Sequence, residues 1–440
     1  MPGKSLVPLF GVVLAAWPVS GTGAQEPVTL AERFDRGTPY RVELQVRLDG
    51  RLALPGDDGK PQEVPLTGAS TLIYDERPLP SDDPRGGKSL RAYRVVRFNR
   101  TMAGKEQSAD VRPGVRRMVV MRSEKGKKAP FSPDGPLTWG EIDVVRTDLF
   151  CPVLVPGLLP GRAVRAGEKW PATAAAVADL TDLDPIEEGG VTVEFVGVVT
   201  LDGKRYAKLS LAGQVRGQSE DGPARQKLDG LAYFDLADAR LSYLKLTGVS
   251  EMLSREGRVT GRLTGTFTMT RGPAERTDDI ADGVVRPRDL VASDDNTQLL
   301  YDNPDLGLRF LYPRRWRVGA VTGRQVTVDE PTGGGVLLSV EPAAELPTAD
   351  QYLRETQDFF RKQGWRTGAI DGPRRAGPVG RFGTDATIAG KQARLEYAVL
   401  TTADGGVTAA ARLPWADRDA LGKDLDRILG SLEVTKRIGR

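Results

Sequence analysis

The chain has 440 residues, of which 39% are hydrophobic and 28% charged, and its 62 basic and 59 acidic residues leave a formal net charge of +3. This balance is typical of a folded protein and provides no overall positive field for nucleic acid. Histidine is absent and Cys151 is the single cysteine, which excludes histidine-activated nucleophiles, histidine-bound metals and an internal disulfide.

The first residues have the composition of a secretory signal peptide. Lys4 supplies a positive start, residues 6–19 form an apolar stretch, and the small residues at 22–24 suit a cleavage site. We therefore expect residues 1–24 to be removed and the protein to be exported, to the periplasm or the cell exterior. No cysteine stands at the cleavage point and no later apolar stretch reaches about 18 residues, so we expect no lipid anchor and no transmembrane segment in the mature chain.

Residues 25–272 have the alternating pattern of a β-rich domain. Apolar residues alternate with polar or charged ones from Tyr40 to Leu48 and again from Leu263 to Met269, which is typical of half-buried strands. Turn signals such as Asp202-Gly203 and Asp229-Gly230 separate further runs and indicate antiparallel hairpins. We predict a large curved sheet, a sandwich or a partial barrel.

A proline-rich segment at 149–170 interrupts this pattern and could divide the region into two subdomains. Cys151 lies in this segment among apolar neighbours. We therefore expect a buried, inert side chain in preference to a reactive thiol.

Several groups of polar residues could carry chemistry, and each also has a plain structural explanation. Ser242 and Lys245 match an S-x-x-K pattern, but they lie in a strand-like run and should point to opposite faces. The acids at 179–188 and at 82–83 suit solvated loops; the first group has the charge for calcium without the EF-hand register, and calcium binding stays open. The basic run at 112–128 surrounds an apolar core, as in a strand with a charged edge. We predict no catalytic, cofactor-binding or metal-binding residues.

Two runs in this region carry a faint resemblance. RAVRAGEKW at 162–170 and GLAYFDLADARLSYLKLTG at 230–248 resemble parts of secreted bacterial β-rich domains of unassigned function. More loosely, the region is similar to lipoprotein-carrier proteins, whose curved sheets hold lipid on a concave apolar face. A solid hydrophobic core would produce the same alternation.

Residues 273–298 are polar with few aromatics and indicate a linker. Beyond the linker, Thr348 and Gln351 form a capping box at the start of a helix that Gly364 ends. We expect strands at 307–312, 325–329, 335–341, 382–388, 393–401 and 407–413, and helices at 348–364 and 415–430. This order predicts a layered α+β domain over residues 299–436.

The two ends of this domain resemble the PsbP-like family. NPDLGLRFLYPRRW at 303–316 runs from a strand into Tyr-Pro and then Trp, and LDRILGSLEV at 425–434 takes a helix into a short strand. The family includes extrinsic photosystem subunits, nuclear-transport accessory proteins and bacterial envelope proteins. The resemblance implies a binding or assembly role without shared catalytic residues, and it assigns Tyr312, Pro313 and Trp316 to packing.

The complete sequence therefore predicts an α+β protein, with an all-β antiparallel curved sheet or sandwich followed by a PsbP-like layered domain. The leading hypothesis is non-enzymatic binding or assembly in the periplasm or envelope, without a cofactor. The expected partner is an envelope protein or an apolar small molecule, and not nucleic acid. One alternative is a carrier of lipid or another apolar ligand in the curved sheet. The other is a carboxylate-dependent glycan-active enzyme, which needs two acids converging in a cleft.

Overall fold

The computed structural model describes residues 26–34, 37–55, 61–80, 87–121, 129–146, 148–219, 222–285 and 290–438. Within these ranges the chain is mostly strand, and every pairing between named strands is antiparallel. The expected signal peptide at 1–24 and the acids at 82–83 lie outside the described residues.

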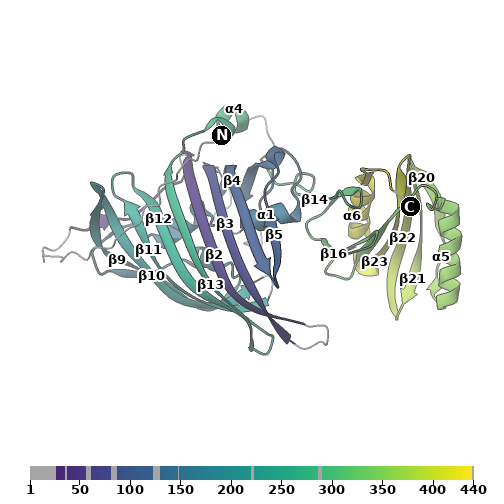
Figure 1. Ribbon diagram of the computed structural model, residues 1–440, viewed down its shortest axis with the longest axis horizontal. Coiled ribbons are helices and arrows are strands. Elements are labelled where there is room, and N and C mark those ends of the chain that lie inside the picture. Colours follow the sequence, from purple (N-terminus) through teal and green to yellow (C-terminus); the bar gives the residue numbers. More distant parts are fainter. Residues whose placement is uncertain are drawn as a thin grey trace, which may run out of the picture.

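A curved sheet of eleven strands occupies the N-terminal part of the chain (Figure 1). Its strands are β2 (Tyr40–Pro55), β3 (Pro61–Leu79), β4 (Lys88–Met102), β5 (Lys105–Ala109), β6 (Arg117–Met121), β8 (Lys169–Pro171), β9 (Ile186–Leu201), β10 (Lys204–Ser219), β11 (Gly222–Asp235), β12 (Arg240–Leu253) and β13 (Val259–Pro273). Their order is β5-β4-β3-β2-β13-β12-β11-β10-β9-β8, and β6 also pairs with β4. Because β13 pairs with β2, strands from both sides of 149–170 belong to one sheet.

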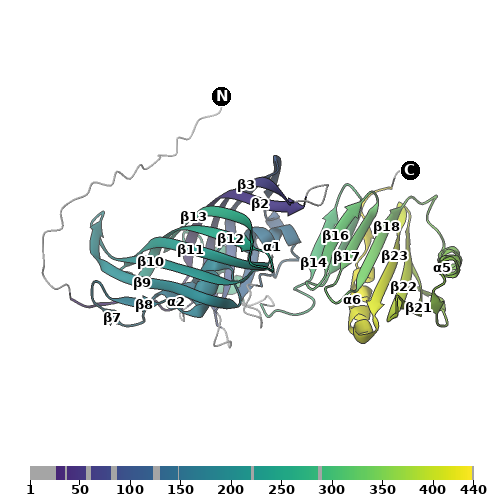
Figure 2. The same cartoon turned by 90° about the horizontal axis from the view of Figure 1, so that it is seen from below.

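The segment between β6 and β9 packs against the concave side of this sheet, whose curvature is clear in Figure 2. It contains α1 (Trp139–Arg146), α2 (Cys151–Leu158), β7 (Ala163–Val164) and α3 (Ala174–Thr181); β7 pairs with β1 (Val28–Thr29), and η1 (Pro113–Val115) precedes β6. Cys151 is fully buried, with its Sγ 3.7 Å from the Sδ of Met269. Its predicted burial is confirmed, and burial raises the pKa of the thiol, which keeps it in the inert protonated form.

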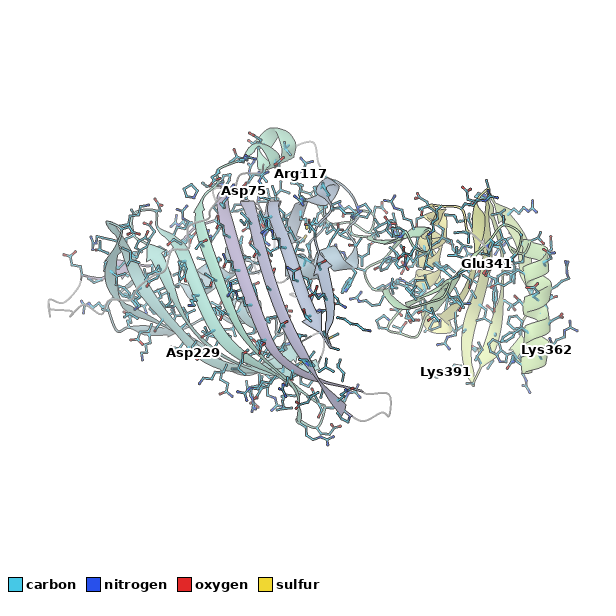
Figure 3. The ribbon with its side chains drawn as sticks, viewed as in Figure 1. Asp75, Arg117, Asp229, Glu341, Lys362 and Lys391 are labelled. Atoms are coloured by element: carbon cyan, nitrogen blue, oxygen red, sulfur yellow. The ribbon has the colours of Figure 1, made fainter. Side chains whose placement is uncertain are left out.

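The first part of the polar segment, residues 273–285, packs on one end of the sheet. It contains η2 (Asp278–Ile280) and α4 (Asp282–Val285). Ile280 is fully buried, and Asp279 forms an ion pair with Arg94 of β4. Arg94 also pairs with Asp75, which lies at the end of the sheet over which α4 passes (Figure 3).

Two further sheets form the C-terminal part. The first contains β14 (Leu299–Asn303), β15 (Leu308–Tyr312) and β24 (Glu433–Val434). The second contains β16 (Arg317–Thr322), β17 (Gln325–Asp329), β18 (Gly335–Glu341), β19 (Arg366–Thr367), β20 (Asp371–Ala376), β21 (Val379–Ile388), β22 (Lys391–Thr402) and β23 (Gly405–Pro414). The helical elements here are α5 (Ala349–Gln363), η3 (Trp415–Asp417) and α6 (Arg418–Gly430).

The predicted α+β fold class is wrong, because antiparallel strands dominate the described residues throughout and the layered α+β C-terminal domain is not clearly supported. Individual predicted elements do occur, including the capping box of Thr348 and Gln351 at the start of α5. The error comes from exposed strands: β16 has no fully buried residue, and such a strand lacks the alternating apolar face that a sequence pattern can reveal. The boundaries predicted for the domains remain predictions.

Candidate binding groove

The concave face of the eleven-stranded sheet sets leucines beside glycines on neighbouring strands. Leu48 of β2 lies opposite Gly68 of β3 and Gly265 of β13, and Leu228 of β11 lies opposite Gly248 of β12. A Cβ atom added at Gly265 would lie 2.7 Å from Cδ2 of Leu48, and one added at Gly248 would lie 2.8 Å from Cδ2 of Leu228. The leucine side chains therefore lie across the glycines, close to the sheet, and leave space above them.

Among the described helices, α2 packs directly on one half of this face, which we call the filled half. There Leu44 and Met269 are at most 1% exposed, since they pack in one core with residues of α2. Further along the same strands is the open half, where Leu48 is 39% exposed and Phe98 and Phe267 are half-buried. The same apolar alternation thus contributes to a buried core at one end of these strands. At the other end it forms a surface that the described helices do not bury.

A groove of about 1150 Å³ runs over the open half, between β4, β3, β2, β13, β12 and β11 on one side and α1 and α3 on the other. Its floor is largely apolar, with Val46, Leu48, Phe98, Leu228, Leu263 and Phe267. Typical small-molecule pockets measure about 300–1,000 Å³. The groove therefore has room for a long ligand, and the side chains of the described residues do not fill this part of the concave apolar face.

Charged residues of both signs line the groove. Arg100, Arg146 and Arg317 lie at the end near β4 and α1, which we call the basic end, where Asp143 and Asp148 also line it. Asp179 and Asp182, at the end of α3, line the groove as well. Since β4 and β11 are five strand positions apart, the apolar floor measures roughly 24 Å across the strands, at a spacing of about 4.8 Å per strand.

Ser70 is a buried polar group in this floor. It is 6% exposed, lies opposite Phe98 in the sheet register and lines the groove. Its Oγ has no hydrogen-bond partner among the described residues. Leaving a buried hydroxyl unsatisfied costs about 1–3 kcal/mol, so a polar group on a ligand would gain from bonding to it.

A buried arginine, Arg91, joins the sheet to the turn between α1 and α2. Its Nε lies 2.9 Å from Oε1 of Glu76, it pairs with Asp148, and its Nη2 donates to the carbonyl oxygen of Leu149 at 3.2 Å. Its guanidinium stands 4.5 Å from the centre of the Tyr74 ring. Burial opposes the charged form, but Asp148 and Glu76 outweigh it and raise the pKa of Arg91. The ion pairs and hydrogen bond of Arg91 therefore fix the turn between α1 and α2 to the sheet.

A second buried arginine, Arg271, fixes the segment that precedes β2. It forms a bidentate pair with Glu32, with nitrogen–oxygen distances of 2.9 and 3.1 Å, and its guanidinium lies 4.2 Å from the centre of the Tyr40 ring. Arg91 and Arg271 are both buried in the filled half, and neither lies in the floor of the groove, which remains apolar.

The N-terminus of α1 depends on the carboxylate of Glu141. It accepts bonds from Nε and Nη2 of Arg112, both at 2.8 Å, and from the backbone N of Thr138 at 2.7 Å. Burial alone would raise the pKa of Glu141, but the bonds from Arg112 and Thr138 lower it below its ordinary value of 4.5. A lowered pKa in the folded state means that the stabilisation is complete above about pH 4.5 and is lost as the pH falls through the folded-state pKa.

We therefore expect wild-type protein to lose more stability than Glu141→Gln when the pH falls from about 6 to about 3. Urea unfolding at a series of pH values measures this difference. Glu63→Gln is the control, because Glu63 is a largely exposed partner of Arg51. If Glu141→Gln and wild type lost stability in parallel, the carboxylate would not anchor α1.

The groups singled out in the sequence form no catalytic centre. Ser242 donates its hydroxyl to the carbonyl oxygen of Tyr233 at 3.1 Å, while Lys245 is exposed on the same strand, β12. Of the acids at 179–188, Asp179 lies in α3 and Glu187 and Glu188 lie in β9, while Asp182 and Asp184 lie in the connection between them, so the group does not form one loop. Among the residues that the structure describes, no group of three or more acidic or cysteine side chains is placed to hold a metal ion.

The described part of the basic run, residues 112–121, contains a strand with charged flanks, as expected. Met118, Val119 and Val120 of β6 are buried, whereas Arg117 pairs with Asp134. Residues 122–128 lie outside the described ranges. The groove residues themselves were not candidates from sequence; the signal that could have marked them is the recurrence of glycine inside apolar strand patterns, at Gly68, Gly248 and Gly265.

No known protein-family model and no curated protein sequence matches the chain. Among solved structures, the Ran-binding protein Mog1p of Saccharomyces cerevisiae is 9% identical, with 32% of this chain and 96% of that chain covered and a TM-score of 0.26. Cyanobacterial PsbP from Synechocystis sp. PCC 6803 is 16% identical, with coverages of 37% and 99% and a TM-score of 0.24.

Lipovitellin, from a structure described as lipid–protein interactions, is 8% identical, with 57% of this chain and 27% of that chain covered and a TM-score of 0.31. These likenesses are too faint to assign a fold family or a function. Among the described helices, none combines the length and the apolar composition needed to cross a membrane.

Proposed function

We propose that the protein is an exported, non-enzymatic carrier that binds an apolar ligand in the groove on the concave face of its eleven-stranded sheet. The observation that carries the proposal is the open half of this face, where a groove of about 1150 Å³ lies over an apolar floor. Burying such a floor beneath a ligand gains roughly 25 cal/mol for each Å² of apolar surface removed from water. Export rests on the composition of residues 1–24 alone.

The groove favours a hydrocarbon ligand over an extended peptide. The central strands β3, β2, β13 and β12 are each paired on both sides, so their backbone groups are already bonded to one another. A peptide lying across them would leave its own N–H and C=O groups without partners, and desolvating these groups is costly. A hydrocarbon chain has no such groups.

The carboxylate-dependent enzyme has less support from the groove. Asp148 is engaged by the buried Arg91, and Oδ2 of Asp179 accepts a bond from the backbone N of Phe150 at 2.8 Å. Both acids thus hold the helices in place.

Binding of the neutral fluorescent probe N-phenyl-1-naphthylamine tests the carrier proposal. We expect saturable binding at one site per chain. The double variant Leu48→Glu/Leu228→Glu should weaken binding at least about tenfold, because the probe would have to desolvate two carboxylates on the floor. Mass spectrometry of the purified protein shows in addition whether residues 1–24 have been removed.

Val196→Glu is the matched control, since Val196 is an exposed apolar residue of β9 outside the groove, 45% exposed. It should bind the probe as wild type does. Probe binding that never saturates, or that is equal in the groove variant and the control, would refute the carrier proposal.

A further inference from the structure

Arg317 stands at the basic end of the groove with its guanidinium stacked on Trp139. The distance from its central carbon to the centre of the indole ring is 4.0 Å, and both side chains line the groove. Its Nη1 donates to the backbone oxygen of Trp316 at 3.1 Å and to that of Arg314. Among the described residues no carboxylate forms an ion pair with it, and these hydrogen bonds go to neutral backbone oxygens.

The surroundings of Arg317 add positive charge. Arg314, beside it in sequence, donates to the carbonyl oxygens of Thr297 and Pro130, which are neutral. Burial, together with the nearby charges of Arg146 and Arg317, lowers the pKa of Arg314 to about 10. Arg146 and its neighbour on α1, Asp143, also line this end of the groove, and each has a further interaction within the chain.

Arg100 approaches the same end from β4. It lies opposite Gly68 on the concave face and lines the groove. Its Nε donates to Oε1 of Gln107 at 3.1 Å, a neutral acceptor, and within the described part of the chain it forms no ion pair. The unsatisfied hydroxyl of Ser70 lies on the adjacent strand, opposite Phe98.

We propose that the ligand of the groove is an anionic lipid, whose phosphate or carboxylate head group binds Arg317 and Arg100 at the basic end while its hydrocarbon chain lies along the apolar floor. This proposal rests on the proposed carrier function and specifies its ligand. Two arginines that form no ion pair with a described carboxylate provide charge-assisted hydrogen bonds to an anion, and stacking on Trp139 holds one guanidinium in place.

Competition between amphiphiles that share one chain tests the head group. Hexadecanoate, hexadecyl phosphate, hexadecanol and hexadecyltrimethylammonium would each be titrated against bound N-phenyl-1-naphthylamine. We expect the two anions to displace the probe at concentrations at least about tenfold lower than hexadecanol, a factor that corresponds to about 1.4 kcal/mol. The cation should be the weakest competitor.

Arg100→Gln/Arg317→Gln should bring the anions to the level of hexadecanol and leave hexadecanol itself unchanged within about twofold. The control Arg97→Gln/Lys391→Gln removes the same charge from exposed positions away from the groove, Lys391 at the far end of the C-terminal sheet (Figure 3). It should keep the preference for anions.

The outcomes separate the two proposals. If hexadecanol competes as well as the anions in wild type, or if the control loses the preference as the arginine variant does, the anionic head group is refuted and the carrier function stands. If none of the four amphiphiles displaces a probe that does bind, a lipid is not the ligand. If the probe itself does not bind, the carrier function fails.

Discussion

Replacing Arg91 by leucine should destabilise the eleven-stranded sheet by about 3–5 kcal/mol. Arg91 is fully buried, and so are its partners Glu76 and Asp148, at 0% and 2% exposed. Without the guanidinium the two buried carboxylates would lose the cation that they share, and removing one partner of a buried ion pair is strongly destabilising. Unfolding by guanidinium chloride, followed by circular dichroism, measures the loss of stability.

Arg97→Leu is the matched control, because Arg97 is an exposed arginine on the same strand, β4. Its substitution should change stability by no more than about 0.5 kcal/mol. Combining Arg91→Leu with Glu76→Gln should recover part of the lost stability, since the substitution of Glu76 removes one of the two carboxylate charges that Arg91 had paired. A loss below about 1 kcal/mol in Arg91→Leu would mean that the two acids find other partners or are protonated.

The sequence pattern predicts the strands well and says little about what covers them. The alternation of Val42, Leu44, Val46 and Leu48 correctly marks one face of β2 as apolar. It cannot reveal that Leu44 is buried while Leu48 is 39% exposed, because the cover comes from α2, about a hundred residues later in the chain. Local periodicity reports which residues share a face and not what lies opposite that face.

The buried ion pairs of Arg91 could not be predicted from the sequence pattern either. Arg91 is an arginine within a strand, as are the exposed Arg97 and Arg47, and nothing in its neighbours sets it apart. Its buried state depends on Asp148, which is 57 residues away in sequence. The fold class was wrong for a related reason: weakly buried strands such as β16 join a sheet through backbone hydrogen bonds, which leave no trace in the side-chain pattern.

Replacing Gly68 by tryptophan should abolish saturable binding of the apolar probe without destabilising the sheet. Gly68 lies in the floor of the groove, and an added Cβ would meet Leu48 at 3.8 Å and the carbonyl oxygen of Asn99 at 3.9 Å, both ordinary van der Waals contacts. The indole therefore has room to stand into the groove, where it would occupy the space of the ligand. Because glycine weakens a strand and an aromatic residue favours one, stability should stay level or rise.

Thr67→Trp provides the control, since Thr67 is the exposed neighbour of Gly68 and points to the opposite face of β3. Both variants add the same indole to the same strand, so a difference in probe affinity between them measures occupation of the groove alone. Fluorescence titration together with thermal unfolding of each variant completes the comparison. Equal probe affinity in the two variants would place the apolar ligand outside the concave face, and the groove between the sheet, α1 and α3 would then be no binding site.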